Sequence, residues 1–564
     1  MKILGIIGRP DVPECHDSSA ALIIENRIVC AIEQERLSRR RHAYGEGCQD
    51  AVQACLDKAG LTLADIDHIA YGWMEELQQK TPLAEFAAAS SELTEIFLPK
   101  TQFAYDTTPP IHFFDHHYTH AAATYFTSGL DDAAVLIMDG QGEHVSSSLF
   151  HAQGKTIREL ETYPIKDSVG LLYGAASAFS GLGWWSEGKF MALASFGHVR
   201  EEIDFRFDPE TGRFSLPAFL EEAWKNPARD EKLHPSVLWW EYFLKYTFPY
   251  RQGDGSDIGY YGDFAATVQH TLEQLAYKLA VRLKRLTGAK NLVLGGGCAL
   301  NCSMNAYLGK TGLFERMYVF PAANDAGCSL GAALSLNYLL NPQAELQPRI
   351  SGPAFGQEYT REAIAAAIQE YGFTAEELSS DELCERVAAD LVDKKIILWF
   401  QGQDEFGPRA LGRRSFLGNP TDRETLVRLN TIKGREMWRP LAPSVLREQA
   451  GIVMEDTEEY GIHRFMLGVA IIRKEWRSRV PAIVHVDFTA RPHLVEKDED
   501  GNYWKVIHAF YRKTDIPLLC NTSLNVAGQP IVHTPAEALE IFKTEADVDT
   551  LALGDFYLTK TRTE

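Results

Sequence analysis

The sequence predicts an α/β protein of more than one domain, and three observations lead to this prediction. At 564 residues the chain is longer than one hydrophobic core usually serves. Its 45% hydrophobic and 24% charged residues are typical of a globular protein. Within the first half, a pattern of short apolar strands and glycine turns occurs twice. These features predict two similar α/β halves that face each other, followed by a further domain.

The repeated pattern consists of an apolar strand, a loop and a hairpin. Both copies alternate β-favouring residues with tight turns, at Asn26-Arg27 in the first copy and Gln153-Gly154 in the second. The predicted strands are residues 2–7, 18–25 and 28–32 in the first copy and residues 133–138, 145–151 and 156–163 in the second. Such a repeat predicts a duplicated fold.

A linker is predicted near residues 340–358, which contain three prolines and no clean periodicity. It divides the chain into domains 1–350 and 351–564, and we expect the extreme C-terminus to pack back on the first domain. Helices are predicted over residues 360–371 and 380–393. A buried strand is predicted over residues 396–400.

Residues 200–260 are rich in Trp, Tyr, Phe, Asp and Glu. We expect an insertion there that supplies a wall of the substrate site. A long amphipathic helix follows, with Asp263 as its predicted N-cap.

Charge and cysteine content exclude some functions. The 77 Asp and Glu outnumber the 56 Lys and Arg, which gives a net charge of −21. This balance opposes binding to nucleic acid and favours a cationic partner, although solubility alone also accounts for it. Nine cysteines, an odd count, fit free thiols in a reducing cytoplasm. The chain shows no signal peptide and no apolar run of about 18 residues, so we expect neither export nor a membrane span.

A metal site is predicted around His116 and His120. Their spacing of four places both imidazoles on one face of a helix. Asp139 ends an apolar strand, and Asp325 stands where a strand gives way to a helix. Two imidazoles with carboxylates suit iron, manganese or zinc. The histidine pair alone is more often accidental, so this prediction depends on the rest of the chain.

The first loop carries Glu14, His16 and Asp17 close to the end of the first strand. A histidine beside a carboxylate acts as a general base or orients a hydroxyl group. A solvent-exposed polar loop is the alternative. The four arginines among residues 36–41 are typical of a solvated helix face, from which one could contact a phosphate.

Two glycine-rich stretches are predicted to contact a nucleotide. Gly188 and Lys189 stand at a turn that enters a helix, which suits an anionic group. Gly295 and Gly296 follow a buried strand, where glycine lets backbone amides approach a ligand closely, and Asn301 opens the next helix. The alternative for the glycines is a tight turn.

The second half concentrates cations in turns. Arg409, Lys433, Arg439 and Arg491 stand beside Gly, Pro, Asn and Ser residues. In a chain of net charge −21, this pattern predicts a small phosphorylated ligand, since guanidinium groups match phosphate oxygens. Each cation alone could belong to a surface ion pair.

The combination resembles the two-domain O-carbamoyltransferases of antibiotic and nodulation-factor biosynthesis, over nearly the whole chain. The motifs that carry the resemblance are His116-His117-x-x-His120-Ala121, Asp139-Gly140-Gln141-Gly142-Glu143, Gly407-Pro408-Arg409-Ala410-Leu411-Gly412, Trp438-Arg439-Pro440-x-Ala442-Pro443-Ser444 and Asn521-Thr522-Ser523-x-Asn525. The first two occur in a half that resembles the duplicated actin/Hsp70-like (Kae1-like) fold. The other three occur in a half that resembles the YrdC-like α/β domain.

The resemblance implies a reaction and a role for each site residue. The second domain would make carbamoyl-adenylate from carbamoyl phosphate and ATP with Mg²⁺, and the first would pass the carbamoyl group to a hydroxyl. The implied metal ligands, for Fe²⁺ or another divalent ion, are His116, His120, Asp139 and Asp325. His16 and Glu14 would face the acceptor hydroxyl. The implied nucleotide contacts of the first domain are Gly188, Lys189, Gly295, Gly296 and Asn301. The implied contacts of carbamoyl phosphate and the adenylate are Arg409, Lys433, Arg439, Arg491, Asn521 and Ser523.

Several points stay open at this stage. Glu14 stands where the resembled family carries Asp, so either Glu14 or His16 could be the base. We expect a small, possibly cationic hydroxylated natural product as acceptor, no nucleic acid or membrane partner, and a monomer or homodimer. The alternatives are a tRNA threonylcarbamoyl-type transferase, which the absence of a basic stripe opposes, and a metal-dependent ATP-hydrolysing regulatory protein.

Overall fold

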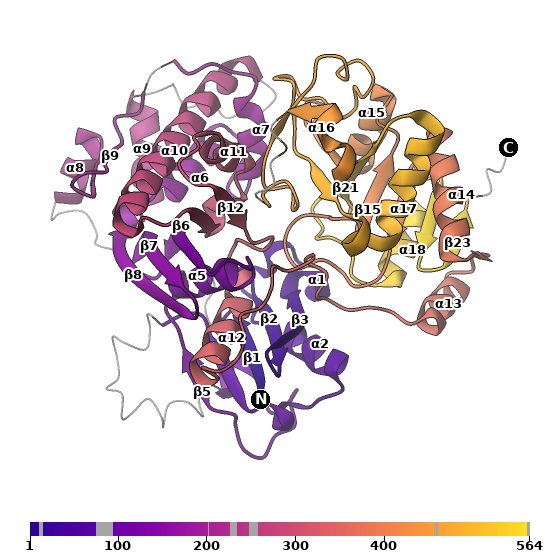
Figure 1. The fold of residues 1–564 in the computed structure, drawn as a ribbon, viewed down its shortest axis with the longest axis horizontal. Coiled ribbons are helices and arrows are strands. Elements are labelled where there is room, and N and C mark those ends of the chain that lie inside the picture. Colours follow the sequence, from indigo (N-terminus) through magenta and orange to yellow (C-terminus); the bar gives the residue numbers. More distant parts are fainter. Residues whose placement is uncertain are drawn as a thin grey trace.

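The structure is a computed structural model that describes residues 1–10, 15–74, 94–200, 202–225, 234–246, 258–455, 457 and 461–560. Figure 1 shows two lobes. The N-terminal residues, in indigo to magenta, form the left-hand and lower lobe, and the orange-to-yellow C-terminal residues form the right-hand lobe. Three large sheets contain most of the strands.

Two five-stranded sheets of the first lobe have the same topology. Their orders are β3-β2-β1-β4-β5 and β8-β7-β6-β11-β12. In each, three strands pair antiparallel, and two further strands continue parallel to the first strand of the repeat. The strands are β1 (Lys2–Ile7), β2 (Ser19–Ile24), β3 (Arg27–Glu33), β4 (His68–Tyr71), β5 (Ile111–Phe113), β6 (Asp132–Gly142), β7 (Val145–Gln153), β8 (Thr156–Pro164), β11 (Asn291–Gly295) and β12 (Arg316–Val319). The predicted α/β class with a duplicated, actin/Hsp70-like first domain is confirmed.

Helices and short 3₁₀ turns surround these two sheets. The helices are α1 (Gln34–Ser38), α2 (Gln49–Ala59), α5 (His116–Phe126), α6 (Val169–Phe179), α7 (Glu187–Ala194), α8 (Ala218–Lys225), α9 (Pro235–Tyr246), α10 (Ile258–Thr287), α11 (Cys302–Lys310) and α12 (Gly327–Leu340). The 3₁₀ turns are η1 (Arg41–Ala43), η2 (Leu63–Asp65), η3 (Ile165–Asp167) and η4 (Gly297–Leu300). A small hairpin of β9 (Arg206–Asp208) and β10 (Arg213–Ser215) completes this lobe.

Helices α5 and α12 cross between the two sheets. Helix α5 packs against β6 and β11, whereas α12 packs on β1 and β2. A Cβ atom on Gly331 of α12 would lie 1.9 Å from the carbonyl oxygen of Thr119 on α5, so this crossing requires glycine. Because His116 and His120 lie on α5 and Asp325 lies just before α12, the crossing fixes the distance between these side chains.

The aromatic segment over residues 200–260 has a different role from the one expected. Its described part forms the β9–β10 hairpin, α8 and α9, and α9 packs on α6. Trp239 and Phe243 of α9 are fully buried, and the ring of Phe243 lies 5.6 Å from that of Phe179 on α6. These rings are core, so the prediction of a substrate wall is wrong for them.

The long helix α10 begins before the predicted N-cap. It starts at Ile258, so Asp263 lies in its second turn. The Asp263 carboxylate instead accepts a hydrogen bond from the backbone N–H of His198 at 2.7 Å and fixes the preceding loop. The N-cap prediction is therefore wrong, because the helix continues one turn further toward its N-terminus.

An eight-stranded mixed sheet organises the second lobe, in the order β13-β23-β22-β14-β15-β21-β16-β20. The strands are β13 (Glu376–Glu377), β14 (Ile397–Phe400), β15 (Arg414–Gly418), β16 (Ala442–Leu446), β20 (His493–Val495), β21 (Leu518–Ser523), β22 (Thr550–Leu553) and β23 (Phe556–Thr559). The helices are α13 (Arg361–Glu370), α14 (Ser380–Val392), α15 (Arg423–Ile432), α16 (Ala450–Val453), α17 (Lys497–Thr514) and α18 (Pro535–Thr544), with the 3₁₀ turn η5 (Arg447–Gln449). A separate three-stranded sheet contains β17 (Met454–Glu455), β18 (Ala470–Ile472) and β19 (Thr489–Ala490).

The predicted linker lies in a segment without helix or strand between α12 and α13. The division into residues 1–350 and 351–564 stays a prediction. The C-terminal strands β22 and β23 pair next to β14 within the second sheet, where all four residues of β22 are buried. We expected the C-terminus to pack back on the first lobe, but up to Lys560 it stays in the second lobe. Residues 561–564 lie outside the described residues.

A buried charged pair of the first lobe holds a loop of the second. The Arg36 side chain is fully buried, and its Nη2 donates to the carbonyl oxygen of Gly407 at 2.7 Å. The N–H of Gly407 donates to Glu33 Oε1 at 2.7 Å. Arg39 donates to two carbonyl oxygens of the second lobe. These two arginines contact the other lobe, so the expectation of a solvated face is wrong for them.

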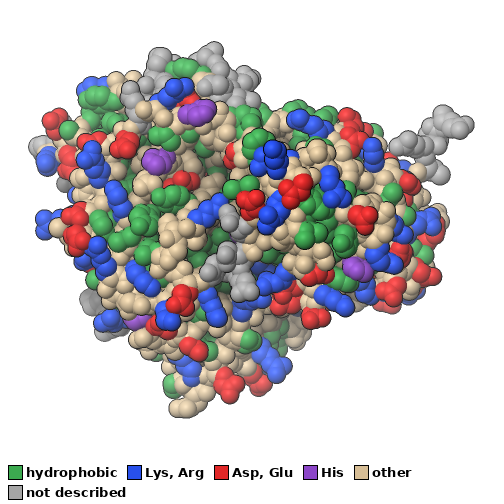
Figure 2. All heavy atoms as spheres, turned by 45° about the horizontal axis from the view of Figure 1, so that its top comes forward, with side chains coloured by type: hydrophobic (Ala, Val, Ile, Leu, Met, Phe, Trp, Pro, Cys, Tyr) green, Lys and Arg blue, Asp and Glu red, His purple; other side chains and the backbone are tan. Residues whose placement is uncertain are grey.

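Charge is mixed on the surface drawn in Figure 2, where acidic and basic side chains are interspersed on the face shown. Among the described residues, no helix has the length and apolar character needed to cross a bilayer.

We expect Gly331→Ala to destabilise the first lobe, because the new methyl group would overlap the Thr119 carbonyl oxygen. The cost should be about 1–3 kcal/mol and should lower the apparent melting temperature in a thermal scan. Gly451→Ala is the matched control, since a Cβ atom there meets nothing within 4 Å. Equal melting temperatures for the two variants would contradict the tight crossing of α5 and α12.

Candidate active site between the two lobes

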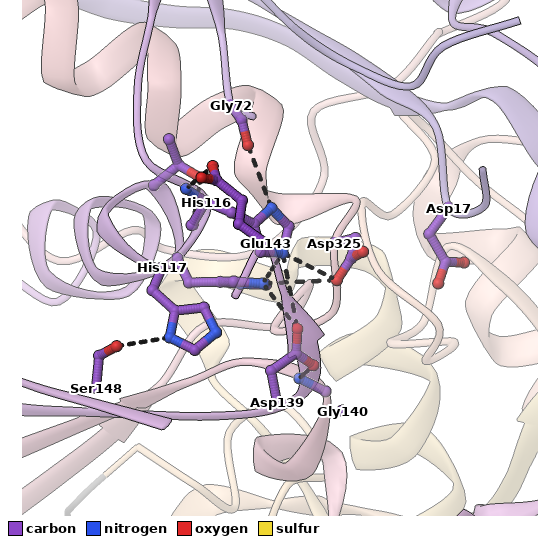
Figure 3. A network of polar contacts seen from close by, with 12 residues as sticks. Asp17, Gly72, His116, His117, Asp139, Gly140, Glu143, Ser148 and Asp325 are labelled. Atoms are coloured by element: carbon purple, nitrogen blue, oxygen red, sulfur yellow. Dashed lines mark hydrogen bonds and ion pairs between the residues drawn. The ribbon is translucent and has the colours of Figure 1, made fainter. Parts of the chain in front are cut away.

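Four side chains from both halves of the first lobe converge at the predicted metal centre (Figure 3). The Nε2 atoms of His116 and His120 are 3.1 Å apart. Asp139 Oδ2 lies 3.7 Å from His116 Nε2 and 3.8 Å from His120 Nε2. Asp325 Oδ1 lies 3.6 Å and 3.5 Å from the same two nitrogens. The structure thus brings the four predicted metal ligands into one site.

Neighbouring groups fix the orientation of His116. Its Nδ1 lies 3.2 Å from the carbonyl oxygen of Gly72, which can only accept a hydrogen bond. Nδ1 therefore carries a hydrogen, and Nε2 points to the centre of the site, where it would be a metal ligand once its own proton is lost. Glu143 Oε1 accepts the backbone N–H of His116 at 3.1 Å, and Asp115 caps α5. The first turn of α5 is thereby held in place.

The charges of the site balance one another. Although burial lowers the pKa of a histidine, Cys328 and Asp325 raise the pKa of His120 to about 10. Although burial raises the pKa of a carboxyl group, His116 and His120 lower the pKa of Asp325 well below its ordinary value. Without a cation, protonated imidazoles therefore neutralise the carboxylates. A divalent ion would supply the same charge and displace these protons.

The geometry and donor atoms fit a divalent transition metal. Ligand atoms about 2.1 Å from one ion are about 3.0–3.4 Å from one another, close to the spacing of 3.1–3.8 Å found here. Two imidazoles and two carboxylates suit Fe²⁺, Mn²⁺ or Zn²⁺. Cys328 also lies within 4.8 Å of both imidazoles, measured between possible ligand atoms. Cys328 was not among the predicted ligands, although it stands three residues after Asp325.

His16 lies beside this centre, whereas Glu14 lies outside the described residues. His16 Nδ1 is 3.2 Å from Asp17 Oδ2, and His42 Nδ1 is 2.9 Å from Asp17 Oδ1. Although burial lowers it, the hydrogen bond to Asp17 and the charge of Asp325 raise the pKa of His16 to about 9. Asp17 orients His16 as a carboxylate orients a general base, and without a bound cation this imidazole is protonated at neutral pH.

The predicted nucleotide glycines hold β11 against β6. The N–H of Gly297 donates to Asp139 Oδ1 at 2.9 Å. A Cβ atom on Gly296, where φ is +83°, would lie 2.3 Å from the carbonyl oxygen of Met138. The triplet that begins at Gly295 therefore needs glycine for packing and for orienting a metal ligand. Contact of Gly295 and Gly296 with a nucleotide stays a prediction.

The other three predicted nucleotide residues make contacts of their own. Asn301 caps α11, and its amide exchanges hydrogen bonds with Gln269. Gly188 is exposed in the first turn of α7. Lys189 Nζ lies 3.0 Å from Glu436 Oε1 in the second lobe. Asn301 thus has a local structural role, and Lys189 joins the two lobes. Their contact with a nucleotide stays a prediction.

Four arginines of the second lobe form a cation cluster, consisting of Arg409, Arg435, Arg439 and Arg491. Burial and the neighbouring guanidinium groups lower the pKa of both Arg409 and Arg435 to about 9. Glu436 lies 3.7 Å from Arg439. In the part of the chain that the structure describes, the other three have no ion-pair partner. Like charges that lack ion-pair partners favour binding of an anion.

The remaining predicted phosphate residues lie under the cation cluster. Lys433 Nζ contacts four oxygens of Ser523 and Asn525 at 2.5–3.1 Å. Asn521 Nδ2 donates to Ser444 Oγ at 2.9 Å, while Asn521 Oδ1 is buried without a partner among the described residues. Lys433 is already satisfied by protein oxygens and holds the Ser523 turn. Its contact with carbamoyl phosphate stays a prediction.

One turn of 3₁₀ helix joins the metal centre to the cation cluster. The turn η4 begins at Gly297, whose N–H binds Asp139, and ends at Leu300, whose carbonyl oxygen accepts from Arg409 Nη2 at 3.4 Å. Three steps of about 2 Å along such a helix separate these two residues. The two predicted sites therefore meet at the interface between the lobes.

Sequence reasoning missed several residues of this region. Arg435 belongs to the cation cluster, and its position two residues after Lys433 was an available signal. Arg41 belonged to the run of arginines interpreted as a solvated helix face. Burial and the charges of other arginines lower the pKa of Arg435 most, and the charge of Arg41 lowers it further. His42 was also missed; it shares the carboxylate of Asp17, which the sequence analysis had placed beside His16. No local pattern shows that residue 41 approaches residue 435.

We expect Asp325→Asn to weaken binding of Fe²⁺ or Zn²⁺ by at least about 100-fold, because it removes a charged ligand. Binding to the wild type should release protons, since the pKa of His120 is raised. Equilibrium dialysis with elemental analysis and a pH-indicator dye measures both effects. His151→Gln is the control, because its imidazole pairs with Asp132 at 2.9 Å outside the site. Unchanged affinity in Asp325→Asn would refute the metal centre.

We expect His16 to make metal-free stability depend on pH. Its folded pKa of about 9 lies above the ordinary 6.5, so the contribution is complete below about pH 6.5 and is lost as pH rises through about 9. Over this range the wild type should lose roughly 1–3 kcal/mol more than Asp17→Asn. Apparent melting temperatures in chelator at several pH values measure the difference. Parallel profiles would show that Asp17 does not control His16.

Comparison with known proteins gives matches over most of the chain. Residues 2–334 match the family model Carbamoyltransferase N-terminus, and residues 388–560 match Carbamoyltransferase C-terminus. The chain is 34% identical to nodulation protein NolNO of Sinorhizobium fredii, over 97% of this chain and 79% of that protein. It is 33% identical to the uncharacterized protein sll1178 of Synechocystis, over 97% and 95% of the two chains.

Two further comparisons are less extensive. Nodulation protein NolO of Bradyrhizobium diazoefficiens is 33% identical over 79% of each chain. The crystal structure of full-length HypF in the phosphate- and nucleotide-bound form is 15% identical in sequence. The match covers 61% of this chain and 56% of that one, with a TM-score of 0.34. The two matched family models and the relatives above 30% identity establish that this chain belongs to the carbamoyltransferase family and is a carbamoyl-transferring enzyme.

Proposed function

We propose that this enzyme is an ATP-dependent O-carbamoyltransferase. It makes carbamoyl-adenylate from carbamoyl phosphate and ATP with Mg²⁺ and passes the carbamoyl group to a hydroxyl of a small molecule. The observation that carries this proposal is the cation cluster. In a chain of net charge −21, three of its four arginines lack an ion-pair partner among the described residues. Two phosphorylated substrates require such an excess of positive charge.

The first step consumes carbamoyl phosphate, ATP and water. Water releases phosphate from carbamoyl phosphate, and the resulting carbamate oxygen attacks the α-phosphorus of ATP, which breaks the bond to the β-phosphate and releases pyrophosphate. Arg409, Arg435, Arg439 and Arg491 hold the phosphate oxygens and stabilise the charge that develops on them. Exclusion of bulk water from the contact between the lobes would protect the carbamate and the adenylate.

In the second step the acceptor oxygen attacks the carbamoyl carbon, AMP leaves, and the hydroxyl proton passes to neutral His16. Asp17 holds His16 Nδ1, so that Nε2 accepts the proton. A divalent ion bound by the four metal ligands would neutralise the adenylate phosphate and offset the charges of Asp139 and Asp325. Since these two carboxylates help to raise the pKa of His16, their neutralisation favours the neutral imidazole. Glu14 is the other candidate for the base.

The proposed acceptor is a small hydroxylated metabolite of a secondary biosynthetic route. A net charge of −21 opposes binding to a phosphate backbone, which argues against the tRNA-modifying alternative. We further propose that the enzyme acts in the cytoplasm as a monomer or homodimer.

Pyrophosphate release tests the proposed function. We expect release only when both ATP and carbamoyl phosphate are present. Arg435→Gln should lower kcat/KM for carbamoyl phosphate by about 10- to 100-fold, because it removes a charged hydrogen-bond donor. Arg361→Gln is the control, since Arg361 is an exposed residue paired with Glu377 at 2.6 Å. Hydrolysis of ATP without carbamoyl phosphate, unaffected by Arg435→Gln, would support the regulatory alternative and sink the proposal.

A further inference from the structure

Exposed aromatic side chains bridge the two halves of the first lobe beside His16. Trp185 is 45% exposed and Tyr44 is 46% exposed. Trp185 belongs to the second half, and its ring centroid lies 4.6 Å from that of His16, 5.3 Å from that of His42 and 6.5 Å from that of Tyr44, all in the first half. We call Trp185 and Tyr44 the aromatic platform. Exposed aromatic rings that adjoin a candidate base offer an apolar surface on which a ligand can stack.

The backbone at the aromatic platform is strained. Trp185 has a φ of +63°, and His42 and Asp17 have φ values of +62° and +52°. A bulky side chain in the left-handed region is unfavourable and persists only where its surroundings hold it. Because the Trp185 ring remains 45% exposed, burial of the indole does not account for this conformation. Such strain gathers at binding sites.

Charges around the aromatic platform nearly cancel. His16 and His42 share the carboxylate of Asp17. Arg41 and Glu187 are close enough for the charge of Arg41 to act on the Glu187 carboxyl group. Among the described residues of this surface, carboxylates therefore do not outnumber the basic groups, and a cationic acceptor finds no excess of negative charge on them.

We propose that Trp185 binds the acceptor, and that the acceptor carries its hydroxyl on an uncharged ring with one apolar face. This inference rests on the proposed function. The C–H groups of such a ring stack on the indole, where aromatic surface gives a large contact at little entropic cost. Stacking directs a hydroxyl at the ring edge toward His16, whose ring lies edge-on to Trp185. A flexible chain lacks this fixed geometry.

Trp185→Gly separates binding from folding, because glycine adopts a φ of +63° without strain. We expect this variant to keep or raise the melting temperature and to release pyrophosphate from ATP and carbamoyl phosphate as the wild type does. Its KM for the acceptor should rise at least about tenfold, with kcat within about twofold. Trp185→Phe should restore most of the affinity. Trp224→Ala, which alters a tryptophan 38% exposed on α8, should have no effect.

Three probes test the acceptor class. Methyl glucoside is an uncharged ring. Glucosamine is a similar ring that carries an ammonium group, and sorbitol is a polyol without a ring. With ATP and carbamoyl phosphate, mass spectrometry should find carbamoylation of methyl glucoside with kcat/KM at least about tenfold above the other two. Equal use of glucosamine or sorbitol, or no use of methyl glucoside, would overturn the acceptor class. A lower melting temperature with loss of both reactions in Trp185→Gly would show that Trp185 is only structural.

Fluorescence distinguishes this inference from the proposed function. Titration with methyl glucoside should change tryptophan emission in the wild type and not in Trp185→Gly, with no ATP present. If pyrophosphate release fails while this Trp185-dependent change persists, the proposed function fails and the aromatic platform stands. If the emission of both proteins responds equally, the platform is refuted whatever the outcome of the pyrophosphate assay.

Discussion

The contact of Arg36 and Glu33 with the peptide groups of Gly407 is the constraint on which the active site depends. Both partners are buried, and a Cβ atom on Gly407 would lie 2.8 Å from the carbonyl oxygen of Pro321. Two residues later, Arg409 reaches Leu300 beside the metal centre. A buried Arg–Glu pair adds little net stability compared with apolar packing. Its effect here is to allow one orientation of the loop that carries Arg409.

The cation cluster creates an opposite demand, because the arginines repel one another in the absence of a bound anion. Burial and mutual repulsion lower the pKa of Arg409 and Arg435, so keeping both charged costs folding free energy. A bound anion would offset this cost and would thereby stabilise the fold around the cluster. Function and stability thus oppose each other at this interface, as they do in many active sites.

Local patterns predicted much of the fold and part of the site. Strand periodicity gave the two hairpin repeats, and the spacing of His116 and His120 on one helix face placed both imidazoles together. The failures depend on distant contacts. The burial of Arg36 against the second lobe follows from tertiary packing, and so does the role of Trp239 as core. Asn301 stood where a ligand contact was expected, yet a helix N-terminus needs a cap whether or not a ligand binds.

The segment from Arg41 to Tyr44 links groups of the two lobes. Arg41 acts on the cation cluster of the second lobe, His42 shares Asp17 with His16, and Tyr44 belongs to the aromatic platform. The N–H of Asp17 also donates to the carbonyl oxygen of His42 at 2.6 Å. The two imidazoles hold the carboxylate of Asp17, and this backbone contact holds the residue that carries it. The geometry of His16 is therefore set by a segment that also contributes positive charge to the cation cluster.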